Sequence, residues 1–177
     1  MLNRLFHSVN NREVLRFLYE SKLIGTTDAD PIVSLEGAEL PKLFMPMANL
    51  RGANLKRINM VDAELIGVHL QGANLQEAYL GGAYLGGAKL RDAQLQHTRL
   101  PMADLNGADL AGTDLRGAEI SGTNLAGVDL RTVTGLTQAQ LKVALGDHTT
   151  QAPNYLERPE AWSMSIEDRR LRLSQTP

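Results

Sequence analysis

The chain has 177 residues, no cysteine and a formal net charge of −2. The missing cysteine excludes disulfides, thiol catalysis and cysteine-based metal sites, and so small a net charge gives no bulk attraction to nucleic acid or to an anionic membrane. Hydrophobic residues make up 43% of the chain but aromatic residues only 5%, so a core must be built mainly from Leu and Ala.

An N-terminal segment, residues 1–32, precedes the main pattern of the chain. Val14, Phe17 and Leu18 recur at helical spacing within Arg12–Ser21, which predicts an amphipathic helix. We expect this helix to cap the coils that follow, because an open stack would expose apolar side chains and unpaired backbone groups. The alternative is a membrane or partner helix, but the apolar stripe is short and the charges around it are mixed.

From about residue 33 to residue 134, every fifth residue is Leu, Met or Ile. Two positions before it there is usually Ala or another small residue, and two positions after it often Gly. On an α-helix a five-residue step advances about 140°, and along a strand an odd step changes face, so neither element alone would bury these residues. A chain that turns a corner every five residues points them all inward, and stacked coils then share one core. The central residues are Leu35, Leu40, Met45, Leu50, Leu55, Met60, Leu65, Leu70, Leu75, Leu80, Leu85, Leu90, Leu95, Leu100, Leu105, Leu110, Leu115, Ile120, Leu125 and Leu130.

These repeats resemble the pentapeptide-repeat family, whose pattern is A(D/N)LXX. Matching segments are Ala53-Asn54-Leu55, Ala73-Asn74-Leu75, Ala103-Asp104-Leu105 and Ala108-Asp109-Leu110. The resemblance implies an all-β solenoid, a right-handed quadrilateral β-helix with four pentapeptides in each coil. Residues 33–134 would then form about five coils, with helical caps at both ends. Residues Arg16 to Ile24, followed by Ile32 to Leu35, are also similar to the lead-in of some bacterial members of the family.

The first coil departs most from the repeat pattern. Leu43 stands where a small residue is expected and Phe44 where Asn or Asp is common, and Pro41 and Pro46 each follow a central residue. Because proline cannot donate a ladder hydrogen bond, we expect this coil to lie partly outside the regular stack.

The five-residue phase is lost after Thr134, and residues 135–177 are predicted to form a C-terminal cap. Thr137 is the expected N-cap of a short helix that Gly146 ends. The stretch from Gly135 to Leu141 is similar to the tail that often follows pentapeptide repeats, and a second, polar helix is predicted from Ser165. The first helix is expected to contain Leu136, Leu141, Val143, Ala144 and Leu145, and the candidate lids on the last coil are Tyr155, Leu156 and Trp162.

Nothing in the chain has the pattern of a catalytic, cofactor or metal site. A twenty-residue coil would stack Arg57, Glu77 and His97 in one column, which we interpret as an exposed charge ladder. No glycine-rich phosphate-binding motif opens a helix, and the histidines are dispersed: His7, His69, His97 and His148. We therefore predict that the protein is no enzyme and uses no cofactor or metal.

Two adjoining sides of the predicted column expose apolar residues, whereas the other two carry most of the basic ones. We propose from this pattern a candidate interaction surface for a protein partner or for a second copy in a homodimer. The alternative is that single exposed apolar residues are merely tolerated. The candidate surface consists of Phe44, Pro46, Val61, Ile66, Tyr79, Tyr84, Pro101 and Met102, separated by Gly81, Gly82, Gly86 and Gly87. The basic residues of the other sides are Arg51, Lys56, Arg57, Lys89, Arg91, Arg116 and Arg131.

Two functions are compatible with these features. The first is a non-enzymatic interaction or scaffold module, which the lack of catalytic residues favours. The second follows from the resemblance, because some family members resemble a DNA duplex, bind DNA gyrase and confer quinolone resistance. The short rod and its nearly balanced charges argue against mimicry, and we do not expect nucleic acid to be a partner.

The family resemblance also implies that the late acidic residues, Asp104, Asp109, Asp114, Glu119 and Asp129, bond neighbouring turns. No apolar run approaches the length of a membrane span, and Met1 to Ser8 is too short and too polar for a signal peptide. We therefore expect a cytoplasmic protein.

Overall fold

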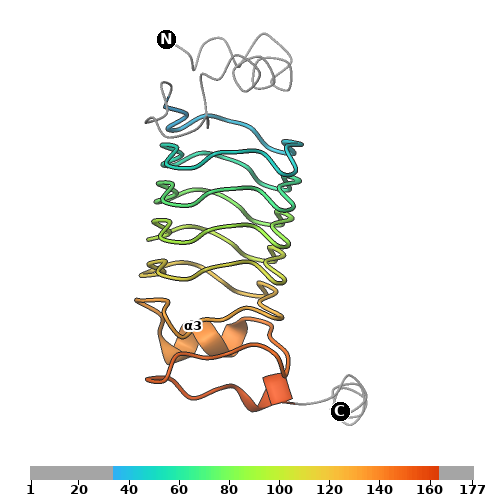
Figure 1. Ribbon diagram of the computed structural model, residues 1–177, viewed down its shortest axis with the longest axis vertical. Helices are drawn as coiled ribbons and strands as arrows, with labels where there is room; N and C mark the ends of the chain where they lie inside the picture. Colours follow the sequence, from blue (N-terminus) through green and yellow to red (C-terminus); the bar gives the residue numbers. More distant parts are fainter. Residues whose placement is uncertain (1–33, 164–177) are drawn as a thin grey trace.

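The computed structural model describes residues 34–163 of the chain. The amphipathic helix expected near Phe17 and the polar helix expected from Ser165 lie outside the described residues. Figure 1 shows the described residues as coils stacked along one long axis, with a short helix, α3, below the coils near the C-terminal end.

The coils pair in parallel, and each residue that bridges lies opposite the residue twenty positions further along the chain. These bridges run from Glu39↔Asn59 to Asp114↔Thr134, and each involves a single residue because the chain turns immediately afterwards. A coil therefore contains four five-residue segments, which makes the cross-section four-sided. The twenty-residue spacing confirms that the central residues of every fourth repeat stack in one column.

Three backbone N–H groups of each typical repeat form the ladder. We number the repeat so that the central Leu is position 3, the small residue before it position 1, and the two turn residues positions 4 and 5. The position 3 N–H donates to position 2 of the next coil, as in Leu55 N to Asn74 O at 2.8 Å. The position 5 N–H donates to position 4 of the next coil, and the position 2 N–H donates to position 1 of the previous coil.

The corner between two segments is a tight turn closed by the backbone. In one example the Ala78 N–H donates to the Leu75 carbonyl at 3.0 Å, and Glu77 at position 5 has φ +58°. A positive φ at this place defines a type II turn, which usually requires Gly. The expected role of glycine at these corners is confirmed, but eight non-glycine residues take the same conformation. In the last corner of the repeats the β-branched Thr132 does not have a positive φ, consistent with the steric penalty on such residues.

The core is the column enclosed by positions 1 and 3. All predicted central residues are buried except Met45, which is half-buried and packs against the core. Thr98, Thr113 and Thr123 replace Ala at position 1, and each hydroxyl donates to a backbone carbonyl, so no hydroxyl is left unpaired in the interior. The core of Leu and Ala expected from the composition is therefore confirmed.

The expectation that the first coil lies partly outside the stack is wrong. Its backbone bonds are regular, with Leu40 N to Asn59 O at 2.7 Å and Met45 N to Glu64 O at 3.0 Å. Leu43 is buried in the core. Pro41 and Pro46 occupy position 4, whose N–H takes no part in the ladder, so a missing N–H there removes no ladder bond.

The C-terminal segment begins with α3, Gln138–Val143. The predicted N-cap is confirmed: Thr137 Oγ1 accepts from the Gln140 N–H, and the Gln140 side chain accepts from the Thr137 N–H at 2.8 Å. The helix ends earlier than expected. Ala144 is already extended, and Leu145 has left the helix to bridge Asn124.

Parallel pairing therefore continues after the five-residue phase has ended. Leu145 pairs with a residue 21 positions earlier, and Gln151 pairs with Asp129, 22 positions earlier. The extra residues relative to the regular spacing are accommodated by α3 and by the loop around Asp147. The final element is the 3-10 helix η1, Glu160–Ser163.

The candidate lids of this end behave differently from one another. Trp162 is buried, and its indole Nε1 donates to the Ala144 carbonyl at 3.2 Å, whereas Leu156 is half-buried. Tyr155 is 59% exposed, so it is not a lid, although its hydroxyl donates to the Val133 carbonyl at 3.3 Å. Tyr155 stays exposed because its phenol bonds to a backbone acceptor at the edge of the stack and does not pack against the core.

Candidate interaction surface

The four sides of the rod differ in surface chemistry, and each is named here together with the turn that follows it. Side 1 is centred on Leu35, Leu55, Leu75, Leu95 and Leu115; side 2 on Leu40, Met60, Leu80, Leu100 and Ile120; side 3 on Met45, Leu65, Leu85, Leu105 and Leu125; and side 4 on Leu50, Leu70, Leu90, Leu110 and Leu130. Position 2 points outward between two inward residues, so it largely decides what each flat side presents.

Every large hydrophobic residue that the described repeats expose lies on side 2 or side 3. These residues are Phe44, Met47, Ile66, Tyr79, Tyr84 and Met102. Met102 is 73% exposed and Tyr84 is 51% exposed. Segregation of this kind is more informative than exposure alone, because isolated exposed apolar residues are common on any protein surface.

The predicted surface residues are found on these two sides, with different degrees of exposure. Tyr79 is at position 2 of side 2, and Phe44 and Tyr84 are at position 2 of side 3. The others are in turns. Val61 and Pro101 are only half-buried rather than fully exposed, whereas Pro46, Ile66 and Met102 are exposed.

Three further apolar residues belong to this surface and were not predicted. Met47 is 66% exposed and follows Pro46 in the same turn. Its position in the five-residue pattern was therefore sufficient to predict that it belongs to this surface. Val143 accepts from the Gly122 N–H, and Leu145 bridges Asn124, which continues the turn after side 2 and the flat of side 3 beyond the repeats. Both are exposed. No five-residue pattern marks them, so sequence reasoning had no signal for their place.

Glycines keep the centre of the surface flat. A Cβ added to Gly81 would be in ordinary contact with the Pro101 ring at 3.4 Å, so the two turns lie directly beside one another. Next to them, the Arg99 guanidinium lies over the Tyr79 ring, 4.9 Å from its centroid. This cation–π contact covers one face of that ring.

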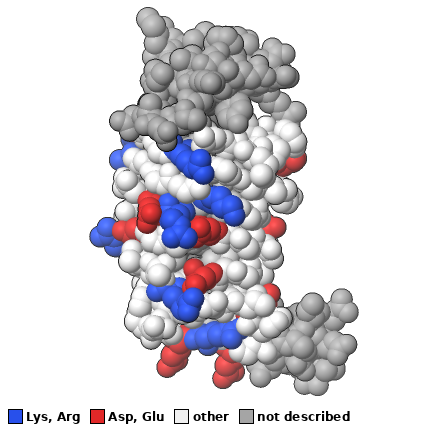
Figure 2. All heavy atoms as spheres, in the orientation of Figure 1, with Lys and Arg blue, Asp and Glu red and all other residues white. Residues whose placement is uncertain are grey.

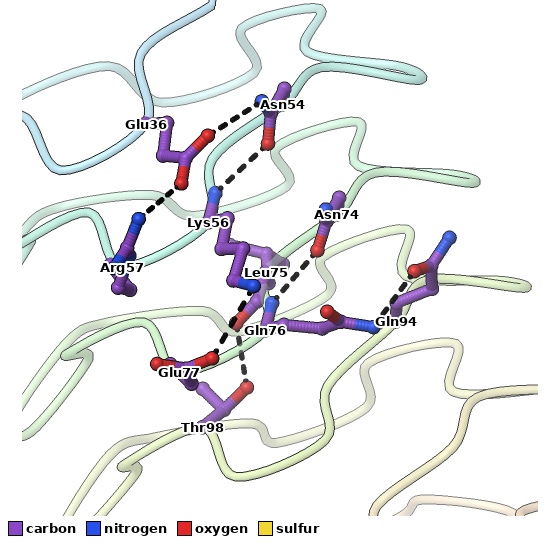
Figure 3. A network of polar contacts seen from close by, with 10 residues as sticks. All are labelled: Glu36, Asn54, Lys56, Arg57, Asn74, Leu75, Gln76, Glu77, Gln94 and Thr98. Atoms are coloured by element: carbon purple, nitrogen blue, oxygen red, sulfur yellow. Dashed lines mark hydrogen bonds and ion pairs between the residues drawn. The ribbon is translucent and has the colours of Figure 1, made fainter.

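Sides 1 and 4 carry five ion pairs of the described repeats. The Arg57–Glu36 pair is 2.5 Å long and the Lys56–Glu77 pair 3.4 Å. Figure 2 shows basic and acidic side chains lying beside one another in a band along the rod. Figure 3 shows how such pairs join an amide ladder on side 1, in which Gln76 Nε2 donates to Gln94 Oε1 at 3.1 Å. The remaining pairs are Arg91–Asp109, Arg116–Asp114 and Arg131–Asp129.

The column of Arg57, Glu77 and His97 is part of this charged half. Arg57 pairs with Glu36 and Glu77 pairs with Lys56, so both ion pairs lead out of the column rather than along it. His97 sits at position 5 with its ring over Gly117. Within residues 34–163 no group of three or more potential metal ligands comes together.

Most of the late acidic residues have a structural role. Asp104, Asp109, Asp114 and Asp129 each accept from the backbone N–H two residues further on. The expected bonding of Asp to the neighbouring turn is therefore confirmed, except at Glu119, whose side chain makes no such bond. Hydrogen bonds from Arg116 and Arg131 lower the pKa of the Asp114 and Asp129 carboxyls.

The carboxylates of sides 2 and 3 differ from those of sides 1 and 4 in their partners. In the described part of the chain, Asp62, Glu64 and Glu119 form neither an ion pair nor a side-chain hydrogen bond, and Asp104 bonds only to Asn124 and to a backbone N–H. The basic residues on these sides are Lys42 and Arg99. The apolar half of the rod is therefore also the half with uncompensated negative charge.

This geometry defines a class of protein, the parallel β-helix built from five-residue repeats. A model of the family described as pentapeptide repeats matches residues 48–78, 69–101 and 103–131, in eight copies. The chain therefore belongs to the pentapeptide-repeat family. Solved structures of this family are right-handed β-helices, and the chain shares that fold.

Solved structures similar to this chain come from different biological settings. The pentapeptide repeat protein Rfr23 from the cyanobacterium Cyanothece 51142 is 21% identical, with a TM-score of 0.52, covering 80% of this chain and 99% of that one. A pentapeptide repeat protein of the Arabidopsis thaliana thylakoid lumen is 26% identical, with a TM-score of 0.56, covering 69% and 86%. QnrB1, a plasmid-mediated fluoroquinolone resistance protein, is 14% identical, with a TM-score of 0.53, covering 79% and 68%.

A comparison with curated proteins gave no match. Among the described residues, no helix has the length and apolar character needed to cross a bilayer.

Proposed function

We propose that this pentapeptide-repeat protein is a non-enzymatic interaction module. In this proposal it is a rod of five coils, capped at both ends, that binds a protein partner through sides 2 and 3 in the cytoplasm. The single observation that supports the proposal is the confinement of exposed large hydrophobic residues in the described repeats to these two adjoining sides. A contiguous apolar surface of this kind usually marks an interaction site.

The rigidity of the ladder supports the same function. Each coil is bonded to the next at several backbone positions per side, so the exposed side chains of Tyr79, Tyr84 and Met102 are carried on a fixed frame. Preorganised groups lose little conformational entropy on binding. A flat, rigid surface with aromatic and methionine side chains has the composition expected at the centre of a protein interface.

The proposal is tested by replacing Tyr79 and Tyr84 with Ala and capturing partners from the source cells with each protein. The wild type is expected to retain a partner that the double variant loses. Lys89→Ala with Gln94→Ala on the charged half is the matched control, and it should retain the partner. Equal retention by all three proteins would contradict a role for sides 2 and 3.

A second copy of the chain is the other occupant that this surface admits. Size-exclusion chromatography with light scattering distinguishes the two cases. A dimer that dissociates on Tyr79→Ala and Tyr84→Ala would make the module self-associating. A wild-type monomer that both substitutions leave monomeric would exclude self-association, and a different protein would then be the occupant of sides 2 and 3.

Regulation of DNA gyrase by DNA mimicry is a weaker proposal. The likeness to QnrB1 concerns the fold, since identity is 14%. A duplex presents about one phosphate charge per 1.7 Å along its axis. The carboxylates of sides 1 and 4 are largely neutralised by Arg and Lys, and the unpaired carboxylates of sides 2 and 3 are few and lie among apolar residues. A gyrase supercoiling assay with added protein tests mimicry, and unchanged activity at micromolar protein would eliminate it.

A further inference from the structure

The charges around the apolar surface indicate the chemistry of what binds there. Tyr84 lies between Glu64 and Asp104 in one ladder column, because it bridges the first above and the second below. Neighbouring rungs are about 4.8 Å apart. The exposed Tyr84 therefore has an acidic residue on the rung above it and another on the rung below it.

A third carboxylate lies at the corner that precedes the repeat of Tyr84. Asp62 has a positive φ, and its Oδ1 lies over Gly82, where an added Cβ would collide with it. Gly82 leads directly into the repeat that carries Tyr84. Neither Asp62 nor Glu64 has a cationic partner in the described chain, in contrast to the paired carboxylates of sides 1 and 4.

The basic residues on this half do not balance these charges. Arg99 is next to Glu119 in the ladder, but its guanidinium lies over the Tyr79 ring. Lys42 is one rung from Asp62 in the same column, and no ion pair joins them. These two cations stand against the four carboxylates of Asp62, Glu64, Asp104 and Glu119. A second copy docked through the same sides would bring two sets of carboxylates together. Like charges placed opposite one another oppose association, so the surface disfavours self-association and favours a basic occupant.

We propose that sides 2 and 3 bind a basic amphipathic segment of another protein. Its apolar side chains cover Tyr79, Tyr84 and Met102, and its Lys or Arg side chains meet the carboxylates at Asp62, Glu64, Asp104 and Glu119. This inference rests on the proposed function and adds the chemistry of the partner. From Asp62 to Glu119 the surface spans about three rungs, or about 14 Å, which matches an α-helix of about ten residues.

The test uses two synthetic probes with the full-length chain. One is an amphipathic helical peptide of Leu and Lys, about fourteen residues long, with a fluorophore at one end. The other has Glu in place of every Lys. Fluorescence anisotropy should show binding of the Lys peptide about tenfold or more tighter than the Glu peptide, and the difference should shrink as salt is added.

Substitutions on the two halves then locate the binding. Asp62→Asn with Glu64→Gln should weaken Lys-peptide binding about fivefold or more, and Tyr84→Ala should weaken it as well. The matched control, Glu77→Gln with Asp92→Asn, removes two charges from the other half and should change binding less than about twofold. Equal weakening by both pairs would overturn the inference, because the peptide would then respond only to net charge.

Two other outcomes separate this inference from the proposed function. If the Glu peptide binds as well as the Lys peptide and Tyr84→Ala abolishes both, the surface docks partners but not basic ones, and only the inference fails. If neither peptide responds to Tyr79→Ala with Tyr84→Ala, both fail. Dissociation of a wild-type dimer by the Lys peptide would identify a second copy as the natural occupant and would overturn the inference.

Discussion

The repeats and the C-terminal segment extend one ladder by different means. In residues 35–134 one arrangement recurs: a buried central residue, a small residue before it and a tight turn after it. In residues 136–163 each contact occurs once. Trp162 fills the end of the core, and Arg158 Nη2 donates to the Asp147 carbonyl at 2.6 Å and to the Trp162 carbonyl at 3.2 Å.

This contrast shows where a solenoid needs individually placed side chains. Within the repeats every coil is covered by the next, so a short periodic pattern is sufficient. After the last coil of the described residues, single side chains take over the backbone groups that a regular repeat would pair. Gln140 Nε2, for example, donates to the carbonyls of Leu115 and Ala118.

The largest effect is expected from Leu80→Ala in the middle of the stack. Leu80 is 1% exposed, and removing three carbons from a rigid column should lower the free energy of unfolding by about 2–5 kcal/mol. Urea denaturation followed by far-UV circular dichroism measures this. The chain has one tryptophan, and its fluorescence should shift to the same midpoint, because the end segment stacks on the repeats. Two separated transitions would mean that the end segment is stable without them.

A smaller effect, confined to the end, is expected from Gly146→Ala. The new Cβ would lie 2.5 Å from Cδ2 of Trp162, so the indole must shift at a cost of about 1–3 kcal/mol. The midpoint read by Trp162 fluorescence should fall more than the midpoint read by circular dichroism. Gly81→Ala is the control, since its Cβ would meet Pro101 at an ordinary 3.4 Å. Equal losses in both variants would contradict close packing at Gly146.

Asp147 should make the stability of the end segment depend on pH. Its carboxylate accepts hydrogen bonds from Thr149 and Thr150, and these, with the Gly127 N–H, lower the pKa of Asp147 well below its ordinary value. A lowered folded pKa means that the contribution is present above the unfolded value of about 3.9 and is lost as the pH falls below it.

We therefore compare wild type with Asp147→Asn by urea denaturation at several pH values. The wild type should be the more stable at neutral pH by about 1 kcal/mol, and the gap should close in acid. The Trp162 signal reports the segment concerned. A gap that stays constant down to pH values below the unfolded pKa would rule out the carboxylate as the cause.

The smallest effect is expected within one turn of the repeats. Asn74 Oδ1 accepts from the Gln76 N–H at 3.1 Å, so Asn74→Ala should cost about 0.5–1 kcal/mol. Gln76→Pro removes the N–H that Asn74 satisfied, and it should recover part of the loss. Urea denaturation of the two single variants and of the double variant completes a double-mutant cycle. If the two losses in the free energy of unfolding simply add, the Asn74 side chain does not act through the Gln76 N–H.

The fold was predictable because one spacing recurs through more than half of the chain. A period of five places the same residue type inward at every step, and only a chain that turns at each step can bury them all. The Pro residues misled the interpretation of the first coil because the ladder uses the N–H groups of positions 2, 3 and 5. Pro41, Pro46 and Pro101 all occupy position 4, and each follows a position 2 residue other than Asn or Asp.

The C-terminal segment was harder to predict because local preference and long-range pairing compete there. Leu145 continues the apolar spacing of α3, but its backbone bonds with Thr123 and Leu125 hold it in the ladder instead. On the surface, the columns were sufficient to place Tyr79 and Tyr84. The pairing of carboxylates could not be read from the sequence, because neighbouring columns bring several acids and bases within reach and the side-chain geometry decides between them.

The twenty-residue coil has a consequence for how chains of this kind change length. Deleting a single pentapeptide would leave every Leu pointing inward, so the interior would tolerate it. All residues downstream, however, would move back by one side, a quarter turn around the axis. The apolar half would then be broken into two patches facing different directions. Insertions and deletions that preserve the outer pattern must therefore come in multiples of a full coil, a constraint imposed by the outside of the rod rather than by its core.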